Sequence, residues 1–234
     1  MRTWLLLSLF LNLVGLIGIV WLTQRLGGIN YLRYRLGASQ HIGAVYQHRV
    51  EQLAQLPLPP DATVLLGNSL TQQGNWSELL GRTVYNRGIG GDVTDHLLKR
   101  LTPLTQAQPR RVYLLIGIND LLFHPPDYVL RNYRRLLERF RAETPRTEVI
   151  VTSLLPVNNE VRRTGIDNVA VRAVNAELPA LAAEFDYPFL ELHTAFTDAT
   201  GKLDARFTLD GIHLNGAGYA TWVQTLRSAG LESG

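Results

Sequence analysis

A serine, an aspartate and a histidine in this sequence stand where they could act together as a nucleophile and its base. Ser69 comes three residues after the apolar run at residues 64–66. A serine on a sharp turn after a strand projects its hydroxyl into the crevice beyond the sheet, and its backbone N–H can face an anion. Asp210 precedes His213 by three residues, so its carboxylate can accept a hydrogen bond from Nδ1 and leave Nε2 to take a serine proton. These residue types in this spacing predict acyl transfer through a serine.

Two further segments could stabilise the negative charge that such a reaction develops. Residues 88–92 read Gly-Ile-Gly-Gly-Asp, and their three glycines let the backbone approach a ligand closely. Asn119 can donate a side-chain N–H to an oxyanion. The glycine segment lacks both the Gly-x-Gly-x-x-Gly pattern and the Lys-Ser/Thr ending of phosphate-binding loops, which disfavours a phosphate site.

Each of these segments also has a purely structural interpretation. Ser69 could cap a helix, the glycines could form a tight turn, and Asn119 could end a strand in an Asx turn. A single histidine is more often structural than catalytic. Together, however, the segments supply a nucleophile, a base, an orienting carboxylate and oxyanion donors, which favours catalysis.

The pattern around these segments predicts a parallel sheet covered by helices on both faces. Short apolar runs alternate with helical patterns, as in α/β proteins. We expect strands at residues 63–66, 83–86, 111–116, 148–152 and 188–192, and helices at residues 43–56, 127–143, 168–185 and 217–227. Ligands bind beyond the carboxyl ends of such strands. The serine, glycine and asparagine segments directly follow the first three strands, and the histidine lies before the last helix.

The chain begins with a nearly unbroken apolar run at residues 4–22. About 20 helical residues, at roughly 1.5 Å each, span the ~30 Å hydrocarbon core of a bilayer. No Ala-x-Ala-like cleavage site follows the run, so we favour an uncleaved anchor over a signal peptide. We therefore expect a transmembrane anchor at residues 1–28, a juxtamembrane linker and helix at residues 29–60, and a catalytic domain at residues 61–234.

Composition excludes several kinds of site. The chain has no cysteine, so a disulfide framework, a thiolate metal site and a cysteine nucleophile are ruled out. The net charge is only +3, and nothing in the sequence indicates a nucleic-acid partner. Five arginines gather on one predicted helix, which is either a solvated face or a contact for an anionic surface or lipid head groups. They are Arg131, Arg134, Arg135, Arg139 and Arg141.

On these residues the chain resembles the SGNH hydrolases, also called the GDSL esterase and lipase family. The four letters stand for Ser, Gly, Asn and His, which match Ser69, a glycine of residues 88–91, Asn119 and His213. The glycine loop looks most like that of platelet-activating-factor acetylhydrolase-like members. That likeness makes Gly91 the oxyanion glycine, with Gly90 as the second choice, and puts the family's aspartate at Asp210. The resemblance covers about residues 61–226, and Asn68 departs from it, because the family commonly has aspartate there.

The resemblance implies a three-layer α/β/α sandwich of flavodoxin-like type, with a five-stranded parallel sheet and no metal or organic cofactor. It implies ester hydrolysis through an acyl-serine, with the oxyanion held by the Ser69 N–H, the Gly91 N–H and the Asn119 side chain. It also points to a catalytic domain outside the cytoplasm, although the arginines that flank the apolar run point the other way.

The substrate is less well defined than the chemistry. A short acyl group on a carbohydrate or a lipid fits the resemblance. Leu121 and Phe123 directly follow the asparagine segment, and Asn158 follows the fourth strand, so all three are candidate substrate contacts. Two alternatives remain open. One is an acyltransferase that uses the same triad, and the other is a catalytically silent, membrane-anchored domain that binds glycan or lipid.

Overall fold

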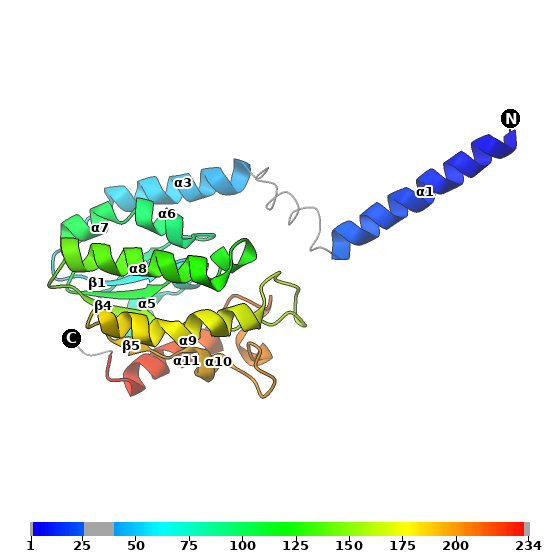
Figure 1. Cartoon of the computed structure of the whole chain (residues 1–234). Helices are drawn as coiled ribbons and strands as arrows, with labels where there is room; N and C mark the ends of the chain where they lie inside the picture. The colour runs from blue at the N-terminus through cyan, green and yellow to red at the C-terminus, as the bar shows by residue number, and fades with distance from the viewer. Residues whose placement is uncertain (1, 26–39, 232–234) are drawn as a thin grey trace. The chain divides into compact units, whose positions relative to one another are not determined.

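The computed structural model describes residues 2–25 and 40–231 (Figure 1). The chain forms two compact units, residues 1–44 and 45–234. Of the predicted juxtamembrane linker and helix at residues 29–60, residues 29–39 lie outside the described residues.

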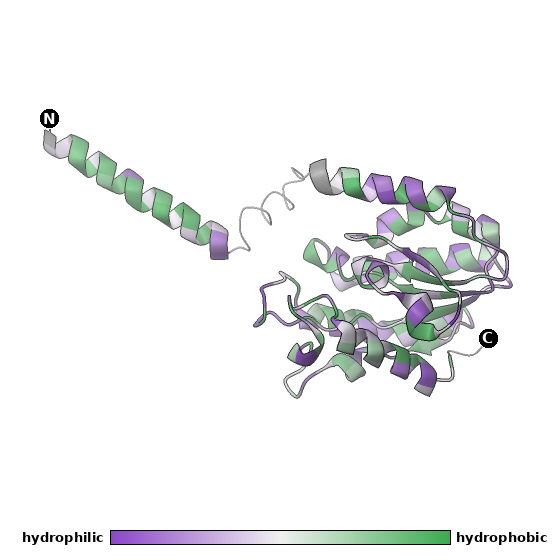
Figure 2. Cartoon of the chain, turned by 180° about the vertical axis from the view of Figure 1, so that it is seen from behind, coloured by the Kyte–Doolittle hydropathy of each residue, from purple (hydrophilic) through white to green (hydrophobic). Residues whose placement is uncertain are grey.

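The first unit contains α1 (Arg2–Arg25). Residues Thr3–Arg25 are long and apolar enough to cross a membrane, and none of the most apolar window is buried. Figure 2 shows this helix as largely hydrophobic along its length. The apolar helix expected from the sequence is therefore present, and by length and composition it fits either a membrane span or an N-terminal signal sequence.

Five parallel strands form one sheet in the order β2-β1-β3-β4-β5, which confirms the predicted sheet. The strands are β1 (Thr63–Gly67), β2 (Tyr85–Gly88), β3 (Arg111–Leu115), β4 (Glu148–Thr152) and β5 (Phe189–Leu190). β2 starts two residues later than expected. The reason is local, because the backbone N–H and C=O of Val84 both bond to the Ser77 hydroxyl instead of extending the strand pairing.

Helices cover both faces of the sheet, and successive strand residues face opposite cores. Val64 and Leu66 pack with one set of helices, whereas Leu65 packs with the other. The first set is α6 (Thr94–Lys99), α7 (Thr102–Ala107), α8 (Pro126–Glu143) and α9 (Asn168–Glu184). The second set is α4 (Ser69–Gln72), α5 (Trp76–Leu80), α10 (His193–Phe196) and α11 (Gly216–Ser228). Two 3-10 turns, η1 (Asp120–Leu122) and η2 (Ala205–Phe207), lie in the loops, and α3 (Gln40–Gln55) precedes the sheet.

The arginines of α8 are mostly engaged with neighbours in the same domain. Arg134 pairs with Glu184, and Arg139 pairs with Glu143. Arg135 lies 3.7 Å from an Asp95 oxygen, Arg141 bonds to the Glu184 carbonyl, and Arg131 lies over the Tyr128 ring. These contacts favour the solvated helix face over a dedicated anion-binding surface.

Candidate active site

Ser69 lies at the point where β1 turns into α4. Gly67 ends the strand, and a Cβ there would lie 2.2 Å from the Leu115 carbonyl oxygen, so only glycine fits this close approach of β1 to β3. Asn68 then caps the helix, because its Oδ1 accepts from the Leu70 N–H at 3.0 Å. Its Nδ2 is buried and has no partner among the described residues. An aspartate would have no such donor to leave unpaired, so the hydrogen bonding here differs from that of the usual family motif.

His213 bridges Asp210 and Ser69 by two hydrogen bonds. Its Nε2 lies 3.0 Å from Ser69 Oγ, and its Nδ1 lies 2.7 Å from Asp210 Oδ2. The second carboxylate oxygen of Asp210 accepts from the backbone N–H groups of Ile212 and His213, at 3.1 and 2.8 Å. The loop therefore fixes the carboxylate, and the carboxylate fixes the imidazole.

The electrostatics of this loop keep Asp210 ionised. Partial burial acts to raise the pKa of its carboxyl group. Hydrogen bonds from the His213 side chain and from the backbone of His213 and Ile212 outweigh burial, so the pKa lies below its ordinary value. A carboxylate of this kind holds the imidazole with Nδ1 as donor and Nε2 as acceptor.

The glycine loop after β2 differs in the availability of its two candidate N–H groups. The Gly90 N–H is occupied, because it donates to Gln72 Oε1 at 2.5 Å. In the part of the chain that the structure describes, the Gly91 N–H has no hydrogen-bond partner. Gly91 also has a φ of +77°, a conformation that L side chains rarely adopt.

Asn119 joins the asparagine segment to this glycine loop. Its Nδ2 donates to the Asp92 carbonyl oxygen at 2.9 Å, and the residue is buried. A side-chain amide carries two N–H bonds, so this contact leaves the other one to serve a second acceptor. The structure thus brings Asn119 to the end of the same loop that contains Gly91.

Asp120, which the sequence does not mark as functional, makes a second connection between the same two loops. Its carboxylate accepts from the backbone N–H and the hydroxyl of Thr94 at the start of α6. Asn132 of α8 donates to the same hydroxyl at 2.8 Å. Burial, only partly offset by the Thr94 hydrogen bonds, raises the pKa of Asp120 to about 6.

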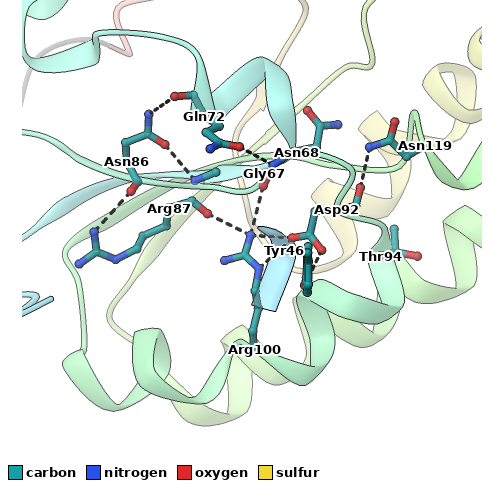
Figure 3. A network of polar contacts seen from close by, with 12 residues as sticks. Tyr46, Gly67, Asn68, Gln72, Asn86, Arg87, Asp92, Thr94, Arg100 and Asn119 are labelled. Carbon is teal, nitrogen blue, oxygen red and sulfur yellow. Dashed lines mark hydrogen bonds and ion pairs between the residues drawn. The ribbon is translucent and has the colours of Figure 1, made fainter. Parts of the chain in front are cut away.

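A buried ion pair lies beneath the glycine loop (Figure 3). The Asp92 carboxylate is fully buried and pairs at 2.6 Å with Arg100, the residue that directly follows α6. Arg100 also donates to the carbonyl oxygens of Gly67 and Arg87, at 3.1 and 2.9 Å, near the ends of β1 and β2. Sequence reasoning missed Arg100, because nothing in its neighbourhood marks it as different from the other arginines.

The three predicted substrate contacts have different surroundings. Phe123 is 40% exposed, and Leu121 is half-buried against the core below α8. Asn158 is buried, and its amide bonds to the Leu203 carbonyl and to the backbone N–H groups of Glu160 and Val161. Its own N–H donates to the Gly211 carbonyl at 2.7 Å, so it orders the loops beside His213 and we do not retain it as a substrate contact.

Apolar side chains are exposed around the catalytic end of the sheet. Phe123 follows β3, Val161 lies in the loop after β4, and Leu209 directly precedes Asp210. Their exposed fractions are 40%, 40% and 86%. Among the described residues, no group of three or more His, Cys, Asp or Glu side chains is arranged to hold a metal ion.

Comparison with known proteins finds a matching family model and a related protein. The model of the GDSL-like lipase/acylhydrolase family matches residues 65–221. Platelet-activating factor acetylhydrolase IB subunit alpha1 from Homo sapiens is 30% identical over 176 residues, which cover 70% of this chain and 73% of that protein.

Solved structures show the same fold at low identity. A structure named for a platelet activating factor from Streptococcus pneumonia aligns with a TM-score of 0.75 and 24% identity, and covers 85% of this chain and 98% of its own. A GDSL-like lipase from Bacteroides thetaiotaomicron aligns with a TM-score of 0.66 and 24% identity, and covers 79% and 96%.

Proposed function

Because this chain belongs to the GDSL-like lipase/acylhydrolase family and is a hydrolase acting on ester bonds, we propose that it forms an acyl intermediate on Ser69. His213 acts as the base, and Asp210 orients it. The observation that carries this proposal is the chain of hydrogen bonds from Ser69 Oγ to His213 Nε2 at 3.0 Å and from His213 Nδ1 to Asp210 at 2.7 Å.

The proposed reaction has two halves. His213 Nε2 takes the Ser69 proton while Oγ attacks the ester carbonyl carbon, and the carbonyl electrons move to oxygen. When the tetrahedral intermediate collapses, the alcohol leaves with the proton from His213, and the acyl group stays on Ser69. A water molecule then attacks the acyl group with His213 again as base, which releases the acid and restores the serine.

The oxyanion is held by the Ser69 N–H, the Gly91 N–H and the Asn119 side chain. The occupied N–H of Gly90 supports Gly91 as the glycine donor, since a group already bonded to Gln72 is not available to the intermediate. The contact of Asn119 with the Asp92 carbonyl supports a fixed position for the amide. Donors held in place before the reaction stabilise developing charge without reorganisation.

The substrate we propose is a short acyl ester of a partly apolar alcohol, such as a lipid, in preference to an acetylated carbohydrate. The exposed side chains of Phe123, Val161 and Leu209 support this choice, because apolar groups beside the catalytic loop suit an apolar ligand. The human relative is named a platelet-activating factor acetylhydrolase, which is consistent with a short acyl group. We also propose that α1 anchors the enzyme in a membrane; a catalytic domain outside the cytoplasm remains a prediction.

The test uses the full chain in detergent micelles with p-nitrophenyl acetate, butyrate and octanoate, and Ser69→Ala as the control. We expect turnover in the wild type that is abolished in the variant, with an acyl adduct on Ser69 detected by mass spectrometry. Turnover that persists in Ser69→Ala would contradict the proposal. Addition of an acceptor alcohol then separates hydrolysis from acyl transfer, because a transferase forms the new ester in place of the free acid.

A further inference from the structure

The helix α3 lies outside the region that matches the family model, yet one of its side chains reaches the loop that contains Gly91. The Tyr46 hydroxyl donates to Asp92 Oδ1 at 3.0 Å, and Asp92 directly follows Gly91. The Tyr46 ring also lies against His96 of α6, with a ring centroid distance of 5.1 Å. Figure 3 shows Tyr46 and Arg100 converging on the same carboxylate.

The two oxygens of the Asp92 carboxylate bond to different partners. Tyr46 bonds to Oδ1, whereas Arg100 bonds to Oδ2 through Nε at 2.8 Å. The Asp92 side chain has no exposed surface, so removal of one partner leaves a buried charged oxygen without its hydrogen bond. Burial raises the pKa of this carboxyl group, and Arg100 and Tyr46 act against that rise by stabilising the charged form.

The backbone of Asp92 is part of the proposed oxyanion site. Its carbonyl oxygen accepts from Asn119 Nδ2 at 2.9 Å, and its peptide bond joins it to Gly91. A shift of Asp92 would therefore move two of the three proposed oxyanion donors together. The Arg100 contacts with the carbonyls of Gly67 and Arg87 connect the same carboxylate to the end of the strand that precedes Ser69.

The other end of α3 is also attached to the domain. Arg87 of β2 donates to the carbonyl oxygens of Leu56 and Pro57, each at 3.3 Å, and Leu53 is buried. From residue 45 onward the helix therefore contacts the domain near both of its ends. These contacts fix the position of the Tyr46 side chain.

We propose that Tyr46 is a positioning residue for the oxyanion donors, so that the helix before the family domain forms part of the catalytic machinery. The inference rests on the proposed function of Gly91 and Asn119. Negative charge on the carbonyl oxygen develops only in the transition state, so loss of the Tyr46 hydroxyl lowers kcat and leaves substrate binding unchanged.

The experiment compares Tyr46→Phe with the wild-type full chain in detergent micelles, with p-nitrophenyl butyrate as substrate. The variant loses one oxygen atom and keeps the ring beside His96. Tyr128→Phe is the matched control, because Tyr128 also bonds to an aspartate, Asp95, but lies on α8 and makes no contact with Asp92. We expect kcat to fall about tenfold in Tyr46→Phe, with KM unchanged. Both constants should remain near wild type in Tyr128→Phe. Loss of a direct oxyanion donor would instead lower kcat by about 10²–10³.

A second readout separates positioning from general destabilisation. Inhibition by an alkylboronic acid, which forms a charged tetrahedral adduct with the serine, should weaken by the same factor as kcat/KM in Tyr46→Phe. Asp92→Asn keeps the shape of the side chain but removes the charge to which both Tyr46 and Arg100 bond, so it should lower kcat at least as much as Tyr46→Phe, at unchanged KM.

Wild-type kcat in Tyr46→Phe, an equal loss in Tyr128→Phe, or a change confined to KM would each overturn the inference. Failure of the proposed function itself is distinguishable, because Ser69→Ala would then retain turnover.

Discussion

The Asp210–His213 half of the proposed site is built within a single loop, whereas the Gly91–Asn119 half depends on elements that are far apart in the sequence. Asp210 accepts hydrogen bonds from the backbone and the side chain of His213, only three residues away. Asp92, beside Gly91, is instead held by Tyr46 from α3, Arg100 after α6 and Asn119 after β3. A motif can specify the first half almost alone, but the second half requires the whole domain.

The largest expected effect lies in the triad, in which Ser69 bonds to the Asp210–His213 half from the end of β1. Ser69→Ala removes the nucleophile and should lower kcat by about 10⁴-fold or more, to background, because a triad without its serine retains only binding and oxyanion stabilisation. Steady-state assays on p-nitrophenyl esters measure this. His213→Ala should fall to the same level, and the double variant should be no worse than either single variant; an additive loss would mean that the two residues do not act as one unit.

Loss of one donor from the Gly91–Asn119 half should lower kcat less than loss of the nucleophile does. Asn119→Ala removes one oxyanion donor and should lower kcat by about 10²–10³ with little change in KM. Single-turnover kinetics check that acylation is the step that slows. Small and equal effects of Ser69→Ala and Asn119→Ala would contradict the assignment of both residues.

The pH dependence of stability tests the role of Asp120, which connects the two loops of the Gly91–Asn119 half. Because burial raises the pKa of Asp120 from 3.8 to about 6, the folded state binds this proton more tightly than the unfolded chain. The Asp120 contribution to stability therefore falls as the pH rises from about 4 to about 6 and is constant above that range, a change of up to about 3 kcal/mol.

Asp120→Asn should remove this contribution. Urea unfolding of the two proteins at pH 4, 5, 6 and 7 gives the difference in the free energy of unfolding, which should shift in favour of the variant as the pH rises. A difference that is independent of pH would show that Asp120 titrates normally.

A smaller effect is expected from the surface beside the triad. Leu209→Asp places a charge on an 86% exposed leucine next to Asp210, and should lower turnover of a lipid ester in vesicles several-fold by weakening apolar contact. Hydrolysis of soluble p-nitrophenyl acetate should stay unchanged. Leu56→Asp, at the far end of α3 from Tyr46, is the control, and an equal loss there would remove the support for a lipid substrate.

The smallest effect should come from removal of the apolar helix. Deletion of residues 1–28 should give a soluble protein with wild-type turnover of p-nitrophenyl butyrate, since it leaves α3 in place.

The longer deletion of residues 1–56 is the contrasting variant. It removes Tyr46 as well and should lower kcat at least as much as Tyr46→Phe. A folded but inactive product of the first deletion would assign α1 a catalytic role.

The sequence alone determined the elements whose causes are local. Short apolar runs that alternate with helical patterns predicted five parallel strands, and the length of the apolar run at residues 4–22 predicted an apolar helix. The segments with Ser69, Gly91 and Asn119 followed strands, and parallel strands bring their carboxyl ends to one edge. Proximity of these groups thus follows from the order of the segments, and the spacing of three residues suffices for the Asp210–His213 hydrogen bond.

Only the tertiary structure decided the contacts between distant residues. Tyr46 and Asp92 are 46 residues apart, and Asp120 and Thr94 are 26 apart, so no periodicity or spacing relates them. The sequence predicted Asn158 as a substrate contact because it follows the fourth strand, but the side chain is buried and its amide joins two loops. The physical reason is that a hydrogen bond within one turn depends on local backbone geometry, whereas a buried long-range bond depends on which surfaces the packed elements bring together.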